Sequence, residues 1–287
     1  MSATRQGTLR QGITRLQSAG VENARSEAEW LLARLLDVKP LELHLDDSSL
    51  PLEAAQQFLA QITARSSGIP LQYLLGDAEF FGLRLAVAPG VFIPRPETEV
   101  IVQAVVEALR ERSGTLQRPL RLLDLGTGSG CIAISLARAL PACVVVGVEL
   151  SWRPLCAARE NIARHGLTER VHLIQSRWME ALRGTFDGIV TNPPYVPSRQ
   201  VDRLPLDVRQ EPRLSLDGGR DGLREVRALL EQVPAHLSPG GIVAIECGED
   251  QADRIARQLR QSPWVDSVRV LADLAHRPRG VLIIRNE

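Results

Sequence analysis

Hydrophobic residues recur every three or four positions across residues 8–68, with polar residues between them. This is the period of helices that bury one face. Gly20 and Pro51 interrupt the pattern, so it predicts three or four short helices instead of one long helix. The apolar positions include Leu9, Ile13, Leu16, Trp30, Leu31, Leu35, Phe58, Leu59 and Ile62. We therefore expect a small helical domain over residues 1–77.

The pattern changes at residue 78, where apolar and polar residues begin to alternate. Alternation predicts β-strands, because successive side chains of a strand point to opposite faces. Pro89 and Gly90 separate the alternating run 78–87 from the apolar run 91–93. This arrangement predicts a β-hairpin over residues 78–95 that links two domains.

Residues 96–287 alternate helical and strand patterns. Val100–Leu109 has helical periodicity, and Glu97 or Thr98 is placed to cap that helix. After Pro119, short apolar runs alternate with helical stretches, which is typical of a doubly wound, mostly parallel sheet with right-handed crossovers. The predicted strands are Leu120–Leu125, Cys143–Glu149, Val171–Gln175, Phe186–Thr191, Ile242–Cys247, Val265–Leu271 and Val281–Arg285. We expect one α/β domain of the Rossmann-like kind.

Composition places the chain among ordinary globular proteins. It has 287 residues, 44% of them hydrophobic, and 34 basic residues balance 34 acidic ones. No overall positive field therefore favours a nucleic-acid partner. The amino-terminal residues do not lead into an apolar signal core, and no apolar run is long enough to span a membrane. We expect a cytoplasmic protein without membrane contact.

Four cysteines are present, and none stands in a C-x-x-C pair or at a spacing from histidine that suits zinc. They are Cys131, Cys143, Cys156 and Cys247. We interpret them as thiols in a reducing compartment and expect no metal site.

A glycine-rich turn follows the first predicted strand of the larger domain. Its residues are Gly126, Thr127, Gly128, Ser129 and Gly130. Glycines permit a tight bend and a close approach of a ligand to the backbone. The spacing is G-x-G-x-G, whereas a dinucleotide pyrophosphate site has G-x-G-x-x-G. S-adenosylmethionine carries no phosphate, so we expect these five residues to contact that cofactor.

Three further residues belong to this predicted cofactor site. Glu149 ends the second strand about 20 residues beyond the glycines, the separation expected of an acid that binds ribose hydroxyls. Trp178 follows the third strand, where it either stacks on the adenine ring or packs in the core. Asp124 either binds the amino group of the cofactor or ties down the glycine turn.

The tetrapeptide after the fourth strand predicts methyl transfer to nitrogen. Its residues are Asn192, Pro193, Pro194 and Tyr195. Asn-Pro is also a common turn opener, but the carboxyl end of a strand is where open α/β sheets bind ligands. The Asn192 side-chain oxygen and a backbone carbonyl can accept both N–H groups of a planar amide, and Tyr195 can cover its flat face. The tetrapeptide would assist methyl transfer by orienting the substrate nitrogen and by electrostatic stabilisation, and no catalytic base is required.

We assign Asn192, Pro193 and Tyr195 as catalytic residues and all four residues of the tetrapeptide as substrate-binding. Asn192 is also expected to contact the cofactor.

Together these residues resemble the release-factor glutamine methyltransferases, the PrmC/HemK family. The shared motifs are Pro70–Gly76, Phe92–Glu99, Asp124–Gly130, Asn192–Tyr195, Glu211-Pro212 and Asp221–Leu223. The resemblance implies a seven-stranded S-adenosylmethionine-dependent methyltransferase domain with a helical domain that docks the substrate. It implies methylation of the side-chain amide nitrogen (N5) of glutamine in the Gly-Gly-Gln tripeptide of class I peptide chain release factors, which modulates translation termination.

The same resemblance assigns residues to ligands. It implies that Gly126–Gly130, Glu149, Trp178 and Asn192 contact the cofactor, and that Asn192–Tyr195 hold the glutamine. Glu149 stands where the family often has aspartate. Arg177 stands where it often has an acidic residue.

Three alternatives remain. An adenine-N6 or guanine-N2 nucleic-acid methyltransferase would present a similar planar amine after base flipping. Against it, the arginines after the tetrapeptide are interleaved with acidic residues, which makes a poor surface for phosphates. A ribosomal-protein glutamine methyltransferase shares the tetrapeptide, but the run Pro94–Glu99 favours the release-factor branch. A binding module without activity would be expected to have a damaged glycine turn or a replaced Asn192, and neither is seen.

Overall fold

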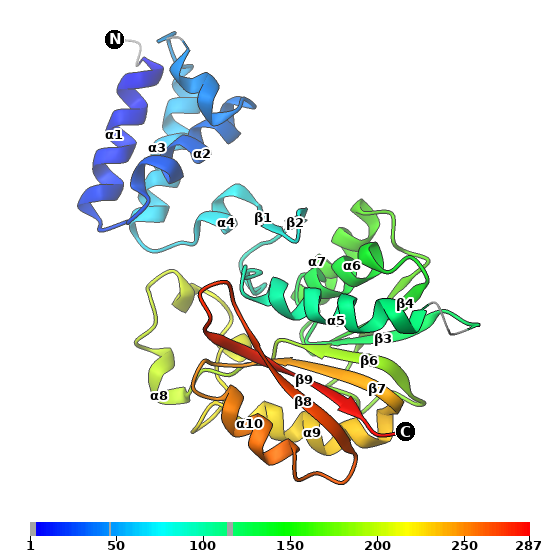
Figure 1. Cartoon of the computed structure of the whole chain (residues 1–287). Coiled ribbons are helices and arrows are strands. Elements are labelled where there is room, and N and C mark those ends of the chain that lie inside the picture. Colours follow the sequence, from blue (N-terminus) through cyan, green and yellow to red (C-terminus); the bar gives the residue numbers. More distant parts are fainter. Residues whose placement is uncertain (1–3, 46, 114–116) are drawn as a thin grey trace. The chain divides into compact units, whose positions relative to one another are not determined.

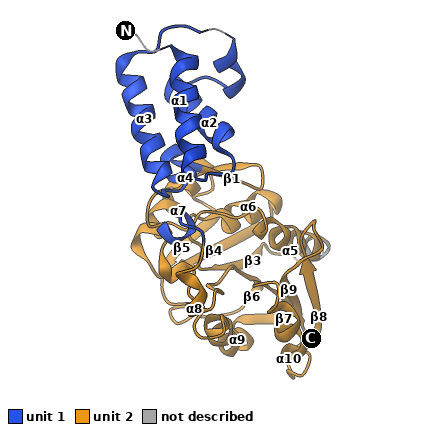
Figure 2. Cartoon of the chain, turned by 90° about the vertical axis from the view of Figure 1, so that its left-hand side faces the viewer, with its two compact units in different colours: residues 1–77, 205–210 blue, residues 78–204, 211–287 orange. Residues whose placement is uncertain are grey.

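The chain divides into two compact units, shown in different colours in Figure 2. The computed structural model describes residues 4–45, 47–113 and 117–287. The helical unit comprises residues 1–77 together with 205–210, and the sheet unit comprises residues 78–204 and 211–287. A segment from within the second part of the chain thus belongs to the first unit.

The helical unit is built from α1 (Arg5–Ser18), α2 (Ala24–Leu36), α3 (Leu52–Ser66) and the short α4 (Leu71–Leu75), with a 3-10 helix η1 (Pro40–His44) between α2 and α3. Its core contains the fully buried Leu16, Leu31, Leu32, Phe58 and Ile62. Gly12 lets α1 approach α3 closely, because a Cβ there would lie 2.5 Å from the Phe58 ring. The structure confirms the predicted helical amino-terminal part.

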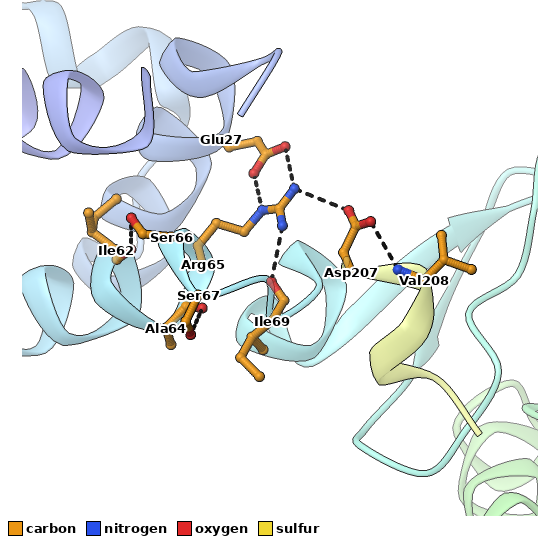
Figure 3. Close-up of polar contacts among 9 residues, drawn as sticks. All are labelled: Glu27, Ile62, Ala64, Arg65, Ser66, Ser67, Ile69, Asp207 and Val208. Carbon is orange, nitrogen blue, oxygen red and sulfur yellow. Dashed lines mark hydrogen bonds and ion pairs between the residues drawn. The ribbon is translucent and has the colours of Figure 1, made fainter. Parts of the chain in front are cut away.

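Arg65, near the end of α3, holds the segment 205–210 on the helical unit (Figure 3). Its guanidinium donates to Glu27 of α2 over 2.5 and 3.3 Å and to Asp207 over 3.3 Å. The side chains of Arg65 and Glu27 are about one-tenth exposed, so this pair is shielded from water. Leu206 packs closely against Gly68, where a Cβ would lie 2.3 Å from Leu206 Cγ.

A two-stranded hairpin of β1 (Asp77–Phe80) and β2 (Leu83–Ala86) precedes the main sheet. Its turn is Phe81-Gly82, both with positive φ, the backbone of a tight hairpin turn. The predicted hairpin is therefore present, but both of its strands lie within residues 77–86: Pro89-Gly90 is not its turn, and residues 91–93 form no strand. Glycine within the alternating run was the signal for the true turn.

The main sheet has seven strands in the order β5-β4-β3-β6-β7-β9-β8. They are β3 (Leu120–Leu125), β4 (Cys143–Glu149), β5 (Val171–Gln175), β6 (Phe186–Thr191), β7 (Leu237–Glu246), β8 (Val265–Ala272) and β9 (Pro278–Arg285). β9 runs in the opposite direction to the other six strands and pairs antiparallel with β7 and β8. The seven-stranded, mostly parallel α/β fold is therefore confirmed.

Helices cover both faces of this sheet (Figure 1). One face packs against α5 (Thr98–Ser113), α6 (Cys131–Ala139) and α7 (Trp152–Arg164), and the other against α9 (Arg224–His236) and α10 (Ala252–Leu259). Short helices α8 (Ser198–Val201), η2 (Val208–Gln210) and η3 (Arg213–Ser215) lie between β6 and α9. Within the described ranges, no helix is long and apolar enough to cross a membrane.

We expect Arg65→Met to destabilise the helical unit, because it leaves the Glu27 carboxylate shielded from water and without its cation. Breaking such a pair costs about 3 kcal/mol. Hydrogen–deuterium exchange of the full chain should show faster exchange of amides in α2, α3 and residues 205–210. Arg34→Met is the matched control, since the Arg34–Asp77 pair in the same unit is more exposed and is worth at most about 1 kcal/mol. Equal exchange in the two variants would contradict the role of Arg65.

Candidate active site

A cavity of about 360 Å³ opens where β3, β4 and β6 end. After β3 the chain adds β4 on one side and, later, β6 on the other. The loops leaving these strands therefore diverge, which is where open α/β sheets form a ligand crevice. Of the predicted site residues, those that line the cavity are Gly126, Thr127, Gly128, Ser129, Glu149, Trp178, Asn192 and Pro194. The structure does not bring Gly130, Pro193 or Tyr195 to its wall.

The glycine turn forms the floor of the cavity. Gly126, Gly128 and Gly130 have φ values of 71°, 58° and 84°, in the left-handed region that favours glycine. The amides of Gly126 and Thr127 donate to the Val148 carbonyl over 2.8 and 2.9 Å, which joins the turn to β4. The turn is therefore held by the backbone of the neighbouring strand.

Asp124 braces this turn from below. Its Oδ2 accepts from the Thr127 hydroxyl over 2.6 Å and from the Ala133 amide over 3.0 Å. Burial raises the pKa of Asp124 to about 7. Asp124 does not line the cavity, so of the two roles considered for it, the structure displays the one that ties down the turn.

Asn161 of α7 connects the turn to the hairpin. Its fully buried side chain donates to the carbonyls of Ser129 and Ala86 and accepts from the Ala86 amide. One amide thereby fixes β2 and the glycine turn together.

Glu149 ends β4 beside the turn. Its carboxyl accepts from the Gly128 amide over 3.1 Å and from the Ser151 amide over 2.8 Å. Burial raises its pKa, while these backbone donors act in the opposite direction. A carboxylate oxygen can accept more than one hydrogen bond, so Glu149 can still accept hydroxyl donors from a ligand in the cavity.

Trp178 lines the cavity beside the glycine turn. It has φ of 47°, and its indole N–H donates to Glu225 of α9 over 3.1 Å. A Cβ on Gly126 would lie 3.6 Å from its ring. Trp178 packs partly against the core and also lines the cavity, so the two interpretations of this residue are compatible.

The tetrapeptide leaves β6 with Asn192 facing the cavity. Asn192 Nδ2 donates over 3.1 Å to the hydroxyl oxygen of Thr98, which is the first residue of α5. Tyr195 lies behind the wall, where burial raises its pKa, and its hydroxyl is 3.4 Å from Glu246 Oε1. Its carbonyl accepts from Gln251 over 2.9 Å.

Glycines at 218 and 222 allow a second stretch of chain to brace the tetrapeptide. A Cβ on Gly218 would lie 2.7 Å from the Pro194 carbonyl oxygen, and one on Gly222 would lie 2.2 Å from that of Tyr195. Only glycine permits so close an approach. This gives a physical reason for the Asp221–Leu223 motif.

Sequence reasoning missed several residues that shape this site. Glu211 accepts from the Ile93 amide over 2.9 Å and from the Arg95 guanidinium, which lies 4.8 Å from the Phe92 ring centre. This contact holds Phe92 and the loop before α9 at the cavity. The motifs around Arg95 and Glu211 are visible in the sequence, but their pairing across more than a hundred residues is not.

Thr98 and Glu246 were also missed as site residues. Thr98 lines the cavity and is 2% exposed, although its place in the sequence indicates only a helix cap. Glu246 ends β7 with 1% exposure, and burial raises its pKa to about 7. A carboxylate at the end of a predicted buried strand was the available signal. Among the described residues, no three His, Cys, Asp or Glu side chains are grouped to hold a metal.

Two family models match the chain. Residues 8–76 match the PrmC N-terminal domain, and residues 83–206 match the methyltransferase small domain. The chain is 42% identical to the release factor glutamine methyltransferase of Moorella thermoacetica over 98% of its own length and 99% of that protein. It is 39% identical to that of Bradyrhizobium diazoefficiens, covering 93% and 90%.

The fold also matches a solved structure. A methyltransferase from Pyrococcus furiosus has a TM-score of 0.53 and 23% identity, and the match covers 72% of this chain and 91% of that one. At this identity the similarity concerns the fold alone.

We expect the buried carboxyl of Glu246 to make stability depend on pH. Its folded-state pKa of about 7 lies above the ordinary value of 4.5, so the folded chain binds the proton more tightly than the unfolded chain. Its contribution is therefore fully present below about pH 4.5 and is lost as pH rises through about 7. Glu246→Gln should lose less stability over this interval than the wild type, measured by urea unfolding at several pH values.

The pKa of Asp124 is raised as well, so it also makes stability depend on pH. Because Asp124 is present in both proteins, its contribution cancels when the two stability profiles are compared. Glu231→Gln, an exposed change on α9, should keep the wild-type pH dependence. Identical profiles for the wild type and Glu246→Gln would show that Glu246 does not titrate as described.

Proposed function

Because the chain belongs to the release factor glutamine methyltransferases, we propose that it methylates the side-chain amide nitrogen of the glutamine in the Gly-Gly-Gln tripeptide of class I release factors. The methyl donor is S-adenosylmethionine. The observation that carries the proposal is one cavity in which the glycine turn and Glu149 meet Asn192. A cofactor and an amide can therefore occupy adjoining parts of the same site.

The cavity residues fit this cofactor. The positive-φ glycines leave the floor open for close backbone contact, Glu149 offers carboxyl oxygens to ribose hydroxyls, and the Trp178 ring offers a flat surface to adenine. When bound, S-adenosylmethionine supplies a methyl group on a positively charged sulfur. The proposed cofactor contacts are Gly126, Thr127, Gly128, Ser129, Glu149, Trp178 and Asn192.

Asn192 prepares the substrate nitrogen. An amide lone pair is delocalised into its carbonyl, so the nitrogen attacks only when it is held with its lone pair directed at the methyl carbon. With Asn192 Nδ2 bonded to Thr98, the other atom of the amide, Oδ1, is the one free to accept a substrate N–H. The tetrapeptide thus contributes orientation and electrostatic stabilisation.

The transfer balances without a further reactant. The N–C bond forms as the S–C bond breaks, S-adenosylhomocysteine leaves, and the nitrogen releases one proton to solvent. Tyr195 supports the tetrapeptide from behind through its carbonyl and hydroxyl.

The charges around the site disfavour a nucleic-acid substrate. Arg213 pairs with Asp202 and Asp217, and Arg227 pairs with Asp221. Arginines already bound to carboxylates are poor phosphate ligands. We therefore favour a protein substrate over adenine-N6 or guanine-N2 methylation, with the helical unit as a docking element for the release factor and the cytoplasm as the compartment.

A substrate panel tests the proposal. Methyl-labelled S-adenosylmethionine is supplied with a release factor, the same factor carrying Gly-Gly-Ala, ribosomal protein, and DNA. We expect label on the release factor only, and none after Gln→Ala. Label on DNA with none on the release factor would refute the assignment.

Two variants should separate binding from transfer. Asn192→Ala removes the acceptor for the substrate amide, so turnover should fall at least about 100-fold while S-adenosylmethionine binding changes only a few-fold. Glu149→Ala removes the hydroxyl acceptor, so the Kd for the cofactor should rise about tenfold or more. Calorimetry and single-turnover kinetics measure the two effects, and unchanged turnover in Asn192→Ala would contradict the positioning role.

A further inference from the structure

The side-chain amide of Asn192 has two orientations of nearly equal shape. Rotation by half a turn exchanges its oxygen and its NH₂ group, and only the oxygen can accept an N–H from a substrate amide. With NH₂ turned toward the cavity, two donors would face each other. Methyl transfer to a glutamine amide therefore needs a neighbour that selects one orientation.

Thr98 is that neighbour. Its hydroxyl accepts from Asn192 Nδ2 over 3.1 Å, and the residue is 2% exposed at the cavity wall. A hydroxyl can also donate, so a threonine alone would accept either face of the amide. Something must direct the hydroxyl proton away from Asn192.

Glu246 supplies that direction. Its carboxyl lies at the end of β7, 1% exposed, and hydrogen bonding with the Thr98 hydroxyl favours its charged form. A carboxylate only accepts hydrogen bonds. Toward a charged Glu246 the Thr98 hydroxyl can only donate, which leaves the Thr98 oxygen to accept from Asn192.

We propose that Thr98 and Glu246 are positioning residues that orient the Asn192 amide, with its oxygen toward the substrate, through the contact of Asn192 with Thr98 and of Thr98 with Glu246. This role rests on the proposed function. These polar contacts run from Asn192 through Thr98 to Glu246, and they join the ends of β6 and β7 to the start of α5.

The charge of Glu246 determines whether these contacts select one orientation of the Asn192 amide. Tyr195 of the tetrapeptide faces the same carboxyl, as do the charges of Glu97 before α5 and Arg279 of β9. Burial and Glu97 raise the pKa of Glu246, whereas Thr98, Tyr195 and Arg279 lower it. A protonated Glu246 can donate to Thr98, which frees the threonine proton to face Asn192 and removes the selection.

The decisive variant is Thr98→Val, which keeps the shape and removes the hydroxyl. With the full-length enzyme, S-adenosylmethionine and release factor, we expect kcat to fall about 10- to 100-fold and the Kd of the cofactor to stay within about twofold. Thr98→Ser should recover kcat to within about threefold of the wild type. The wild-type kcat should fall as pH drops through about 7, and Thr98→Val should lack that fall.

Thr191→Val is the matched control. Thr191 is equally buried and adjoins Asn192 in the chain, but its hydroxyl donates to the Leu125 carbonyl over 2.8 Å. This variant should keep kcat within about threefold. Wild-type kcat in Thr98→Val, a loss that serine does not restore, or an equal loss in Thr191→Val would overturn the inference.

A measurement without turnover separates this inference from the proposed function. In ¹⁵N-labelled enzyme, the Asn192 NH₂ signals are identified by their disappearance in Asn192→Ala. We expect Thr98→Val to shift these signals and Thr98→Ser to leave them near their wild-type positions. Unshifted signals in Thr98→Val would refute the inference. If the wild type methylates no release factor but Thr98→Val still shifts the Asn192 signals, only the proposed function is refuted.

Discussion

The site depends on one constraint: β4 and β6 lie on opposite sides of β3, so the loops that follow these strands must separate. β3 pairs with β4 on one side and with β6 on the other. All three strands are parallel, so their carboxyl ends meet at one edge, and the loops that follow must separate. The glycine turn, Glu149 and Asn192 each stand where one of these strands ends. The proposed cofactor-binding residues and Asn192 lie together because the sheet brings the strand ends together.

Buried polar groups then give these loops one conformation. Asp124 ties the glycine turn to the start of α6, and Asn161 joins it to the hairpin. Glu211 does the same for the segment around Arg95. Each of these groups bonds backbone or charge that would otherwise be buried without a partner, at a cost of about 1–3 kcal/mol for each group. A site that acts mainly by orientation needs such a rigid surround.

Much of the fold could be predicted because its signals are local. The bounds of β3, β4, β5 and β6 agree with the predicted runs, since buried parallel strands are continuous apolar segments between turn residues. β7 begins at Leu237 instead of Ile242, because the glycines and proline before Ile242 resemble a turn although they lie in the strand. The hairpin turn was misplaced for a similar reason, as Pro89-Gly90 is the stronger local turn signal than Phe81-Gly82.

By itself, the sequence determined the helical and α/β parts, the glycine turn, the acid at the end of β4 and the tetrapeptide after β6. Each depends on residues close together in the chain, where period and spacing act directly. Only the tertiary structure decided which predicted residues reach the cavity, and that Tyr195 lies behind its wall. It also brought Thr98 to Asn192, and Glu246 to Thr98 and Tyr195. Those contacts join residues about 50 to 150 positions apart, and side-chain hydrogen bonds over such separations leave no periodic trace in one sequence.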